Sequence, residues 1–237
     1  MTENTKPKRF YKKASGEAVE GGLAVHLDGR PVRTPLGRPL VLPTLPLAKA
    51  VVAEWQAQGD EIIPASMPLC GYANTAIDRV GEDRQTVFDT LIKFADTDLL
   101  CYRADQPDDL VKMQLDYWQP IVDWAEESLG VEMQVTTGVL PVKQSEQTLN
   151  ALKTKLSNFD NMELTAVASL AAACGSMVIA LAVSDQHINA DHAFKISQLD
   201  ENFQSERWGQ DAEAVAAQGK LRENIISATL FLSLLRQ

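Results

Sequence analysis

One uncharged stretch constrains the fold of this chain more than any other feature. The twenty residues that follow Glu163, up to Val183, carry no charge. About 20 apolar residues are enough for a helix to cross a bilayer. This run is instead rich in alanine and small polar residues, no Lys or Arg cluster flanks it, and neither end has an aromatic belt. We therefore predict a buried central helix over residues 163–183, with two or three helices packed around it, and no membrane insertion.

Length and charge narrow the class of protein. The 237 residues are enough for one large domain or two small ones, and the formal net charge is −10. Such an acidic chain is unsuited to nucleic acid or to an anionic membrane surface, but it allows a basic or apolar protein partner. Cys70, Cys101 and Cys174 are widely spaced and indicate neither a disulfide framework nor a zinc site. We expect a reducing compartment, either the cytosol or the location of a mature form already processed.

Short runs typical of β-strands occupy the first part of the chain. Asp28-Gly29 is the strongest hairpin signal between them, because a type I′ turn needs positive φ at both central positions. Prolines at positions 31, 35 and 39 cannot donate to a strand ladder, so the strands should be short or lie at sheet edges. We predict a small antiparallel β-rich domain over residues 1–44, extending at most to about residue 66, with strands near 10–12, 18–20, 23–27, 31–34 and 40–42.

A helical pattern replaces the strand pattern at Pro43-Thr44. Thr44 is suited to cap a helix, and apolar residues then recur at four-residue spacing through Trp55 until Gly59. The predicted fold class is α+β, in which the small antiparallel β-rich N-terminal domain precedes a larger, mainly α-helical domain over residues 45–237. Its further helices are expected over 67–80, 82–95, 108–129 with a kink or break at Pro120, 145–156, 190–208 and 211–235, with a strand at 98–103 and a strand or irregular segment at 131–141.

Motifs that carry catalysis or bind cofactors are absent from the sequence. It contains no P-loop, no dinucleotide-binding GxGxxG, no GxSxG elbow and no HExxH pair. Cys70 has no charge run or histidine near it in the sequence, so a small buried thiol is the better interpretation. We predict no catalytic residue, no cofactor and no metal site. Four possible metal ligands fall at an expected connection between helices, where they are ordinary turn and cap residues: Asp185, His187, Asp191 and His192.

A carboxylate falls on the apolar face of the helix expected over residues 190–208. At about 100° per residue, Glu206 lies only about 20° from Leu199 in the apolar stripe of His192, Ile196, Leu199 and Phe203. A carboxylate placed there would lose hydration. Glu206 should then pair with Lys195 or Arg207, or remain available for a basic group of a partner. An equally weighted alternative is that the helix frays before Trp208 and leaves Glu206 solvated.

Five dispersed motifs resemble one known family. They are RFYKKA at 9–14, DGRPVRTP at 28–35, EW at 54–55, ANTAID at 73–78 and LDENFQSERWGQDAEA at 199–214. In this order, and over nearly the whole chain, they resemble the assembly-chaperone family for the alpha subunit of the ATP synthase catalytic sector. The resemblance implies a β-rich N-terminal domain followed by a helical domain. It also implies a chaperone, not an enzyme, that holds the unassembled alpha subunit, shields its beta-subunit-facing surface and yields it during ring assembly.

The same resemblance indicates which residues matter. We expect Glu206, Trp208 and Gly209, together with Glu201, to form the partner-binding region. The charge of Glu206 should matter more, because Glu201 lies about 200° round the helix from Leu199 and faces the other way. The residues expected to be structural are Trp55, Asp78, Phe203 and Leu199. The stretch Cys70-Gly71-Tyr72 departs from the polar or basic residues more usual there, and no role is predicted for it.

Two other classes of function compete with the chaperone hypothesis. A small hydrolase-like enzyme would use Cys70 or a carboxylate pair such as Glu201 and Glu206, which the helix turns to different sides. A membrane-attached factor would need residues 163–183 to partition into lipid. Only the chaperone hypothesis accounts for the acidity, the missing catalytic motifs and the resemblance. We expect a monomer that binds the alpha subunit but no nucleic acid, in the cytoplasm of a bacterium or, as a mature eukaryotic form, in the mitochondrial matrix.

Overall fold

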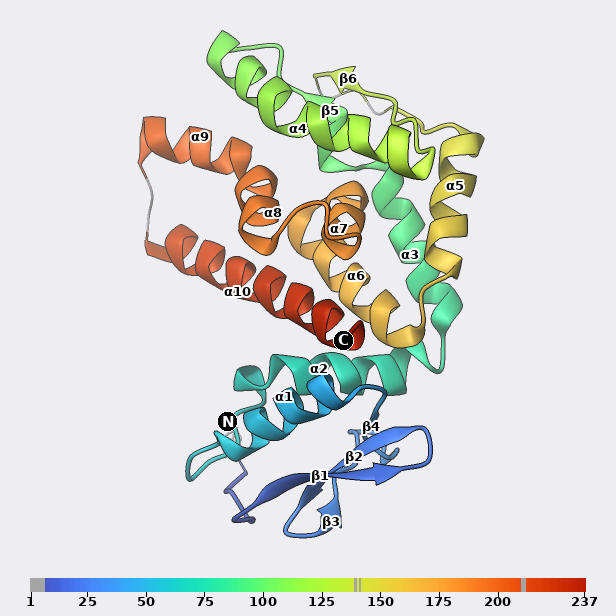
Figure 1. Ribbon diagram of the computed structural model, residues 1–237. Coiled ribbons are helices and arrows are strands. Elements are labelled where there is room, and N and C mark those ends of the chain that lie inside the picture. The colour runs from blue at the N-terminus through green and yellow to red at the C-terminus, as the bar shows by residue number, and fades with distance from the viewer. Residues whose placement is uncertain (1–6, 139, 141, 210–211) are drawn as a thin grey trace. The chain divides into compact units, whose positions relative to one another are not determined.

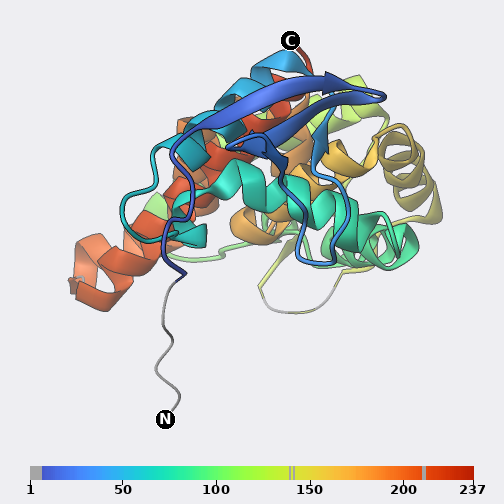
Figure 2. The same cartoon turned by 90° about the horizontal axis from the view of Figure 1, so that it is seen from below.

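Glycine-containing turns fold the N-terminal runs into a small antiparallel sheet (Figure 1). Strand β2 (Gly22–Leu27) pairs with β1 (Ala14–Val19), β3 (Arg30–Pro31) and β4 (Val41–Leu42), each in antiparallel register. Between β2 and β3, φ is 48° at Asp28 and 79° at Gly29, so the turn has the two positive φ angles predicted for it. Figure 2 shows β1 and β2 as the two long blue arrows of this sheet.

Helix α1 (Leu45–Gln56) begins where the strand pattern ends. Thr44 caps it, because the Thr44 hydroxyl oxygen accepts a hydrogen bond from the Leu47 amide (3.3 Å), and Pro46 occupies the first turn. Leu47, Ala48 and Val51 form the buried face of the helix. The helix thus starts where the sequence predicted, but it ends at Gln56, three residues before Gly59.

Helix α2 (Pro68–Thr75) follows a short 3-10 turn, η1 (Pro64–Ser66), and continues into the π-helical turn η2 (Ala76–Val80). The sequence predicted one helix up to Gly81 and did not distinguish the π turn. Gly81 is required at its end, because a Cβ there would lie 2.5 Å from the Ile77 carbonyl oxygen. The extra residue in this turn places Asp78 in the interior and Arg79 outside.

The remaining elements are mostly helices. In chain order they are α3 (Arg84–Asp96), the 3-10 turn η3 (Leu99–Cys101), β5 (Tyr102–Arg103), α4 (Asp108–Leu129), β6 (Thr136–Thr137), α5 (Glu146–Ser157), α6 (Asn161–Cys174), α7 (Met177–Ser184), α8 (Ala190–Ser197), α9 (Leu199–Trp208) and α10 (Ala212–Leu235). The strand predicted at 98–103 is wrong over its first half, which forms η3. Helix α4 runs through Pro120 as one helix, so the chain is not broken into two helices there.

The predicted single helix over residues 163–183 is wrong, because the chain breaks it at Gly175-Ser176. Gly175 has φ of 63°, a left-handed conformation that ends α6, and the Ser176 hydroxyl then caps α7 by accepting from the Ile179 amide (3.0 Å). Every residue of α7 is buried. Ala172 in α6 is exposed, so the run is a core element without being covered on all sides.

Residues 190–208 are likewise two helices. Helix α8 ends at Ser197 and α9 begins at Leu199, with Gln198 between them in a non-helical conformation. Helix α10 agrees with the helix predicted at 211–235, although Asp211 lies outside the described residues, as do positions 139 and 141 of the predicted 131–141 segment. No helix within the described ranges combines the length and the apolar character that a membrane span requires.

The contacts of the chain divide it into two units. Unit 1 comprises Met1–Arg84, Asn161–Thr165 and Leu230–Gln237, and unit 2 comprises Gln85–Asp160 and Ala166–Thr229. The computed structural model describes residues 7–138, 140, 142–209 and 212–237. The α+β class, with a small antiparallel sheet followed by a helical region, is confirmed. Helices α1 and α2 fall in unit 1 with the sheet, whereas the sequence placed a boundary at residue 44, and independent folding of domains 1–44 and 45–237 stays a prediction.

Candidate functional site

Two of the five motifs meet at Asp78, which is buried in unit 1. Asp78 Oδ1 accepts a hydrogen bond from Thr34 Oγ1 (2.6 Å), and Asp78 Oδ2 accepts one from the Leu36 amide (2.9 Å). Arg38, from the same loop, donates to the carbonyl oxygen of Ile77 (2.6 Å). These contacts hold the loop after β3 against the end of α2. They support the structural role expected for Asp78, which substitution has still to test.

The motifs at residues 9–14 and 54–55 are also joined within unit 1. Tyr11 Oη donates to the carbonyl oxygen of Trp55 (2.6 Å), and the two rings meet edge to face with centroids 5.9 Å apart. The Glu54 carboxylate caps α2 by accepting from the amides of Leu69 and Cys70, both at 2.8 Å. Burial raises the pKa of Glu54. Trp55 itself is only partly buried, so its role as an anchor stays a prediction.

The fifth motif, at residues 199–214, lies on α9 and the start of α10 in unit 2. Leu199 and Phe203 form the inner face of α9 and are 4% and 7% exposed. Arg207 lies over the Phe203 ring, 4.3 Å from its centroid, and pairs with Asp109 at 3.5 Å. The burial of Leu199 and Phe203 agrees with the structural role expected of them, which stays a prediction.

Glu206 lies one turn beyond Phe203, near the end of α9. It is exposed and forms no ion pair or hydrogen bond with any described residue. The expected pairing with Lys195 or Arg207 is therefore wrong, because Lys195 donates to Tyr117 Oη (3.0 Å) and Arg207 pairs with Asp109. The helix does not fray before Trp208, since α9 continues through that residue. Glu206 is a solvated carboxylate on an intact helix.

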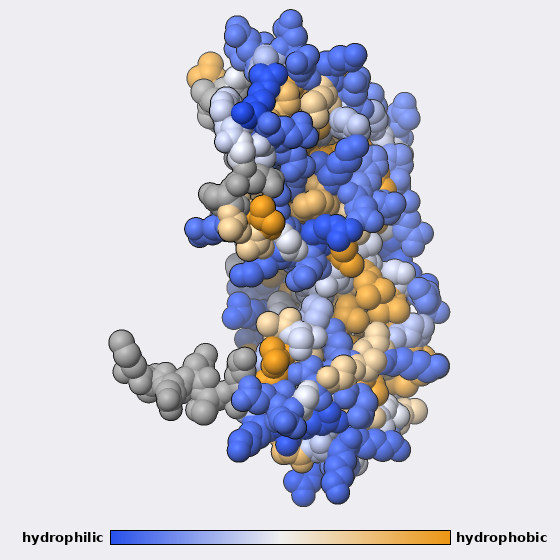
Figure 3. Space-filling view, turned by 90° about the vertical axis from the view of Figure 1, so that its left-hand side faces the viewer, coloured by the Kyte–Doolittle hydropathy of each residue, from blue (hydrophilic) through white to orange (hydrophobic). Residues whose placement is uncertain are grey.

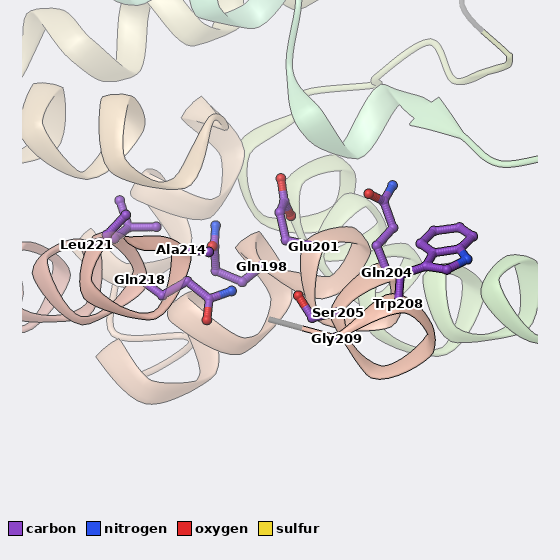
Figure 4. Close-up of a pocket in the computed structure, with 10 residues that line it drawn as sticks. Gln198, Glu201, Gln204, Ser205, Trp208, Gly209, Ala214, Gln218 and Leu221 are labelled. Carbon is purple, nitrogen blue, oxygen red and sulfur yellow. The ribbon is translucent and has the colours of Figure 1, made fainter. Parts of the chain in front are cut away.

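The side of α9 that faces away from the buried Leu199 and Phe203 forms one wall of a groove. The groove has a volume of about 550 Å³, and α10 forms its other wall. Figure 4 shows the lining side chains rising from the two helices. Those from α9 and its ends are Gln198, Glu201, Gln204, Ser205, Trp208 and Gly209, and those from α10 are Ala214, Ala217, Gln218 and Leu221. The groove therefore brings together three of the four predicted partner-binding residues, Glu201, Trp208 and Gly209, and leaves out Glu206.

Side-chain hydrogen bonds hold α8, α9 and α10 in place around this groove. They join three pairs of segments: Trp118 Nε1 donates to the Ile196 carbonyl oxygen (2.8 Å), Gln114 Nε2 to Asp200 Oδ1 (2.8 Å), and Gln218 Nε2 to Asn202 Oδ1 (3.2 Å). Burial raises the pKa of Asp200, and its hydrogen bond from Gln114 and the charge of Arg103 oppose that rise. The groove is thus built on fixed helices, which favours a preformed binding surface.

The groove combines an exposed aromatic ring with a single carboxylate. Trp208 is 78% exposed, the largest exposed fraction among the large hydrophobic residues that the structure describes. Glu201 is the one charged residue among the lining residues. Figure 3 shows hydrophobic residues as separate orange patches on a largely hydrophilic face. Residues 85–237 carry 22 Asp and Glu against 11 Lys and Arg, so this surface lies in the acidic part of the chain.

Catalytic chemistry finds no support in the described part of the chain. Burial raises the pKa of the Cys70 thiol to about 11, so the thiol is protonated at neutral pH and is a poor nucleophile. Glu201 and Glu206 lie on different sides of α9, and only Glu201 lines the groove. No group of three or more His, Cys, Asp or Glu side chains among these residues could hold a metal ion.

Comparison with known proteins identifies the family. Residues 8–126 match the family model of the ATP12 chaperone protein. The chain belongs to the ATP12 chaperone family. Its members are ATP synthase assembly chaperones and not enzymes, so this chain is an assembly chaperone, and the hydrolase-like alternative is set aside. The resemblance found in the sequence is thereby confirmed at the level of the family.

Matches to individual relatives cover almost the whole of this chain. The crystal structure of Atp12 from Paracoccus denitrificans is 40% identical, with a TM-score of 0.93, and the match covers 97% of this chain and 99% of that one. A mutant of the same bacterial protein gives 39% identity and a TM-score of 0.93 over 98% of this chain and 100% of that one. Mitochondrial protein atp12 of Schizosaccharomyces pombe is 23% identical over 238 residues, which are 95% of this chain and 82% of the relative.

Sequence reasoning missed the second wall of the groove. Ala214, Ala217, Gln218 and Leu221 belong to a helix that the sequence did predict, but nothing in its pattern placed it beside α9. One signal was available. The first turns of α10 combine exposed alanines with Val215, which is 51% exposed, and such an uncovered apolar surface marks a place where another molecule can pack.

Proposed function

We propose that this ATP12 chaperone binds the unassembled alpha subunit of ATP synthase in the groove between α9 and α10. There it shields the surface that the beta subunit later covers, and it yields the alpha subunit during assembly of the catalytic sector. The observation that carries the proposal is the exposed Trp208 ring at a groove of about 550 Å³. Exposed aromatic residues beside a preformed groove are typical anchors of protein interfaces.

The chemistry of the groove specifies what the client should present. Trp208 and Leu221 offer apolar surface, and Glu201 offers a carboxylate that lacks a basic partner among the lining residues. The best complement is a segment with a large apolar side chain close to a Lys or Arg. Subunit surfaces that await a neighbour expose such apolar side chains. Family membership supports an ATP synthase subunit as the source of this segment.

Binding without turnover accounts for the remaining properties. The site needs no nucleotide, cofactor or metal, because shielding a surface requires only reversible contact. We propose that the chaperone acts as a monomer in the compartment where the alpha subunit folds, which is the cytoplasm of a bacterium or the matrix of a mitochondrion. The acidity of residues 85–237 favours a client with a basic contact surface and disfavours nucleic acid.

Capture and aggregation assays test the proposal together. The tagged chaperone should recover free alpha subunit from cell extract as its dominant partner and should suppress aggregation of purified alpha subunit. Trp208→Ala should weaken both effects, because the anchor ring is lost, without changing the thermal midpoint. Phe10→Ala is the matched control, since Phe10 is 73% exposed but belongs to unit 1. Recovery of mainly unrelated proteins, or a Trp208→Ala variant that protects the alpha subunit fully, would contradict the proposal.

A further inference from the structure

A second pocket lies in unit 1, formed by the loop after β3 and the helix that runs through α2 and η2. Its volume is about 500 Å³, within the range of roughly 300–1,000 Å³ usual for binding pockets. The lining residues are Pro35, Leu36, Gly71, Asn74, Thr75, Asp78 and Arg79, and we refer to it as the Leu36–Arg79 pocket. None of its residues belongs to the groove between α9 and α10.

The walls of the Leu36–Arg79 pocket are fixed by the fold. Leu36 is held through its amide, which donates to Asp78 Oδ2 (2.9 Å), while its side chain remains 60% exposed. The other Asp78 oxygen accepts from Thr34 Oγ1, so this carboxylate is occupied and buried. At Gly71 no atom lies within 4 Å of the place where a Cβ would be, which leaves the pocket open on that side.

The chemistry of the pocket combines an apolar surface with an exposed guanidinium, while its one carboxylate, Asp78, is buried and accepts hydrogen bonds from neutral donors. Arg79 is exposed, and its guanidinium forms no hydrogen bond or ion pair with any described residue. The Glu82 carboxylate, three residues further along the chain, pairs with Arg38. A second cation, Arg33, is held on the same loop by the Gly37 carbonyl oxygen (2.8 Å). Asn74 adds an amide whose Oδ1 is buried without a partner in the described residues.

The part of the chain that forms this pocket is close to neutral, whereas the rest of the chain is strongly acidic. Residues 1–84 carry 11 Lys and Arg and 10 Asp and Glu, whereas residues 85–237 carry 11 and 22. An acidic partner is therefore not repelled by the part of the chain that forms this pocket, and Arg79 attracts it. A single concave pocket with one exposed leucine suits a peptide segment better than a lipid surface, which needs a broad cluster of cations.

We propose that the Leu36–Arg79 pocket is a second protein-docking site of this chaperone and that it takes an acidic segment of a partner protein. An apolar side chain of the segment packs on Leu36 and Pro35, and a neighbouring carboxylate pairs with Arg79. Asn74 and Thr75 supply polar groups beside the bound backbone. The exposed charged group of this pocket is a cation, whereas that of the groove between α9 and α10 is the carboxylate of Glu201, so the chaperone can hold an acidic and a basic segment at the same time.

A synthetic peptide tests this site without knowledge of the partner. The probe is Gly-Leu-Asp-Leu-Glu-Gly with blocked ends, and the matched peptides replace Asp and Glu by Asn and Gln or by two Lys. Titration of the full chain, followed by amide NMR shifts, should show the acidic peptide binding with shifts at Leu36 and at residues 71–79. The Asn/Gln peptide should bind at least about tenfold more weakly, as expected for loss of a charged pair. No binding at millimolar peptide, or equal binding of the lysine peptide, overturns the proposal.

Variants assign the binding to the pocket. Arg79→Glu should weaken the acidic peptide at least about tenfold and should improve binding of the lysine peptide, while Leu36→Ser should weaken both acidic and Asn/Gln peptides. Lys49→Glu is the control, because Lys49 is an exposed lysine of α1 that does not line the pocket. Unchanged affinity of Arg79→Glu overturns the proposal. Capture of the alpha subunit by the groove is measured separately with the same variants, so failure of one site is distinguishable from failure of the other.

Discussion

Asp78 is a single side chain that joins two segments distant in the sequence. It accepts hydrogen bonds from Thr34 Oγ1 and the Leu36 amide, at 2.6 and 2.9 Å, from an interior position. In Asp78→Asn the amide group would face one of these donors and leave it without an acceptor. Because a buried donor without an acceptor costs about 1–3 kcal/mol, we expect the free energy of unfolding to fall by about that amount in urea titrations.

The control for this substitution is Asp60→Asn, since Asp60 is exposed in the same unit. It should change the free energy of unfolding by less than about 0.5 kcal/mol, as is usual for surface positions. Equal effects of the two substitutions would mean that the carboxylate of Asp78 contributes no more than a surface charge.

Asp98 makes the free energy of unfolding depend on pH. The side chain is fully buried, and burial raises the pKa of its carboxyl to about 6, against hydrogen bonds from Ser176 and from amides that lower it. The folded state therefore holds this proton more tightly than the unfolded state does. The resulting stabilisation of roughly 3 kcal/mol is complete below about pH 4 and is lost as the pH rises from about 4 to about 6.

The measurement compares unfolding curves of the wild type and Asp98→Asn between pH 4 and pH 7. The difference between their free energies of unfolding should change across this window and be constant above it, because only the wild type loses the proton. Direct titration of the Asp98 carboxyl carbon by NMR checks the same point if the variant folds poorly. A carboxyl that titrates near pH 4 would remove this contribution.

At the scale of elements, the break between α6 and α7 depends on a glycine conformation. Gly175 has φ of 63°, and its hypothetical Cβ would meet only Leu99 Cβ at 3.9 Å, so a methyl group fits the space. Gly175→Ala should therefore lower the free energy of unfolding by about 1–2 kcal/mol through backbone strain alone. Thermal and urea unfolding measure this loss.

A glycine in α10 provides the matched control. Gly219 lies inside that helix, with no atom within 4 Å of its hypothetical Cβ, so Gly219→Ala should raise stability by roughly 0.5–1 kcal/mol. Opposite signs for the two substitutions are the expected result. A Gly175→Ala variant that gains stability would mean that α6 and α7 can join into the single helix that composition favours.

Element positions were largely predictable, whereas breaks inside helices were not. Caps and punctuating residues such as Thr44, Asp28-Gly29 and Gly130 indicated boundaries because their chemistry is local. The breaks at Gly175 and Gln198 lie within apolar or amphipathic runs whose periodicity gives no local signal for them. Phase within α9 was still correct, since Leu199 and Phe203 are buried and Glu201 faces the other side.

At the scale of the whole molecule, the sequence could not say what lies opposite the buried face of α9. Pairing of α9 with α10 is a long-range contact that periodicity does not encode, so the sequence indicated only that Glu201 faces away from Leu199. The structure makes that side the wall of a groove. Glu206, which the sequence favoured, is exposed on α9 and does not line the groove. We therefore expect Glu201 to matter more for client binding than Glu206.

Lysine substitutions at Glu201 and Glu206 test which carboxylate matters more for client binding. Glu201→Lys should weaken binding of the alpha subunit by about 2–5 kcal/mol, because the substituted charge would be desolvated in the groove against a basic group of the client. Glu206→Lys should change affinity by at most about 1 kcal/mol, the usual worth of an exposed charge, and mainly slow association at low salt.

Dissociation constants and association rates at two salt concentrations measure both effects. Thermal midpoints should stay near that of the wild type for both, since neither carboxylate has an ion-pair or hydrogen-bond partner among the residues that the structure describes. If Glu206→Lys alone abolishes binding, the client contacts the projecting end of α9 and the groove is not its site.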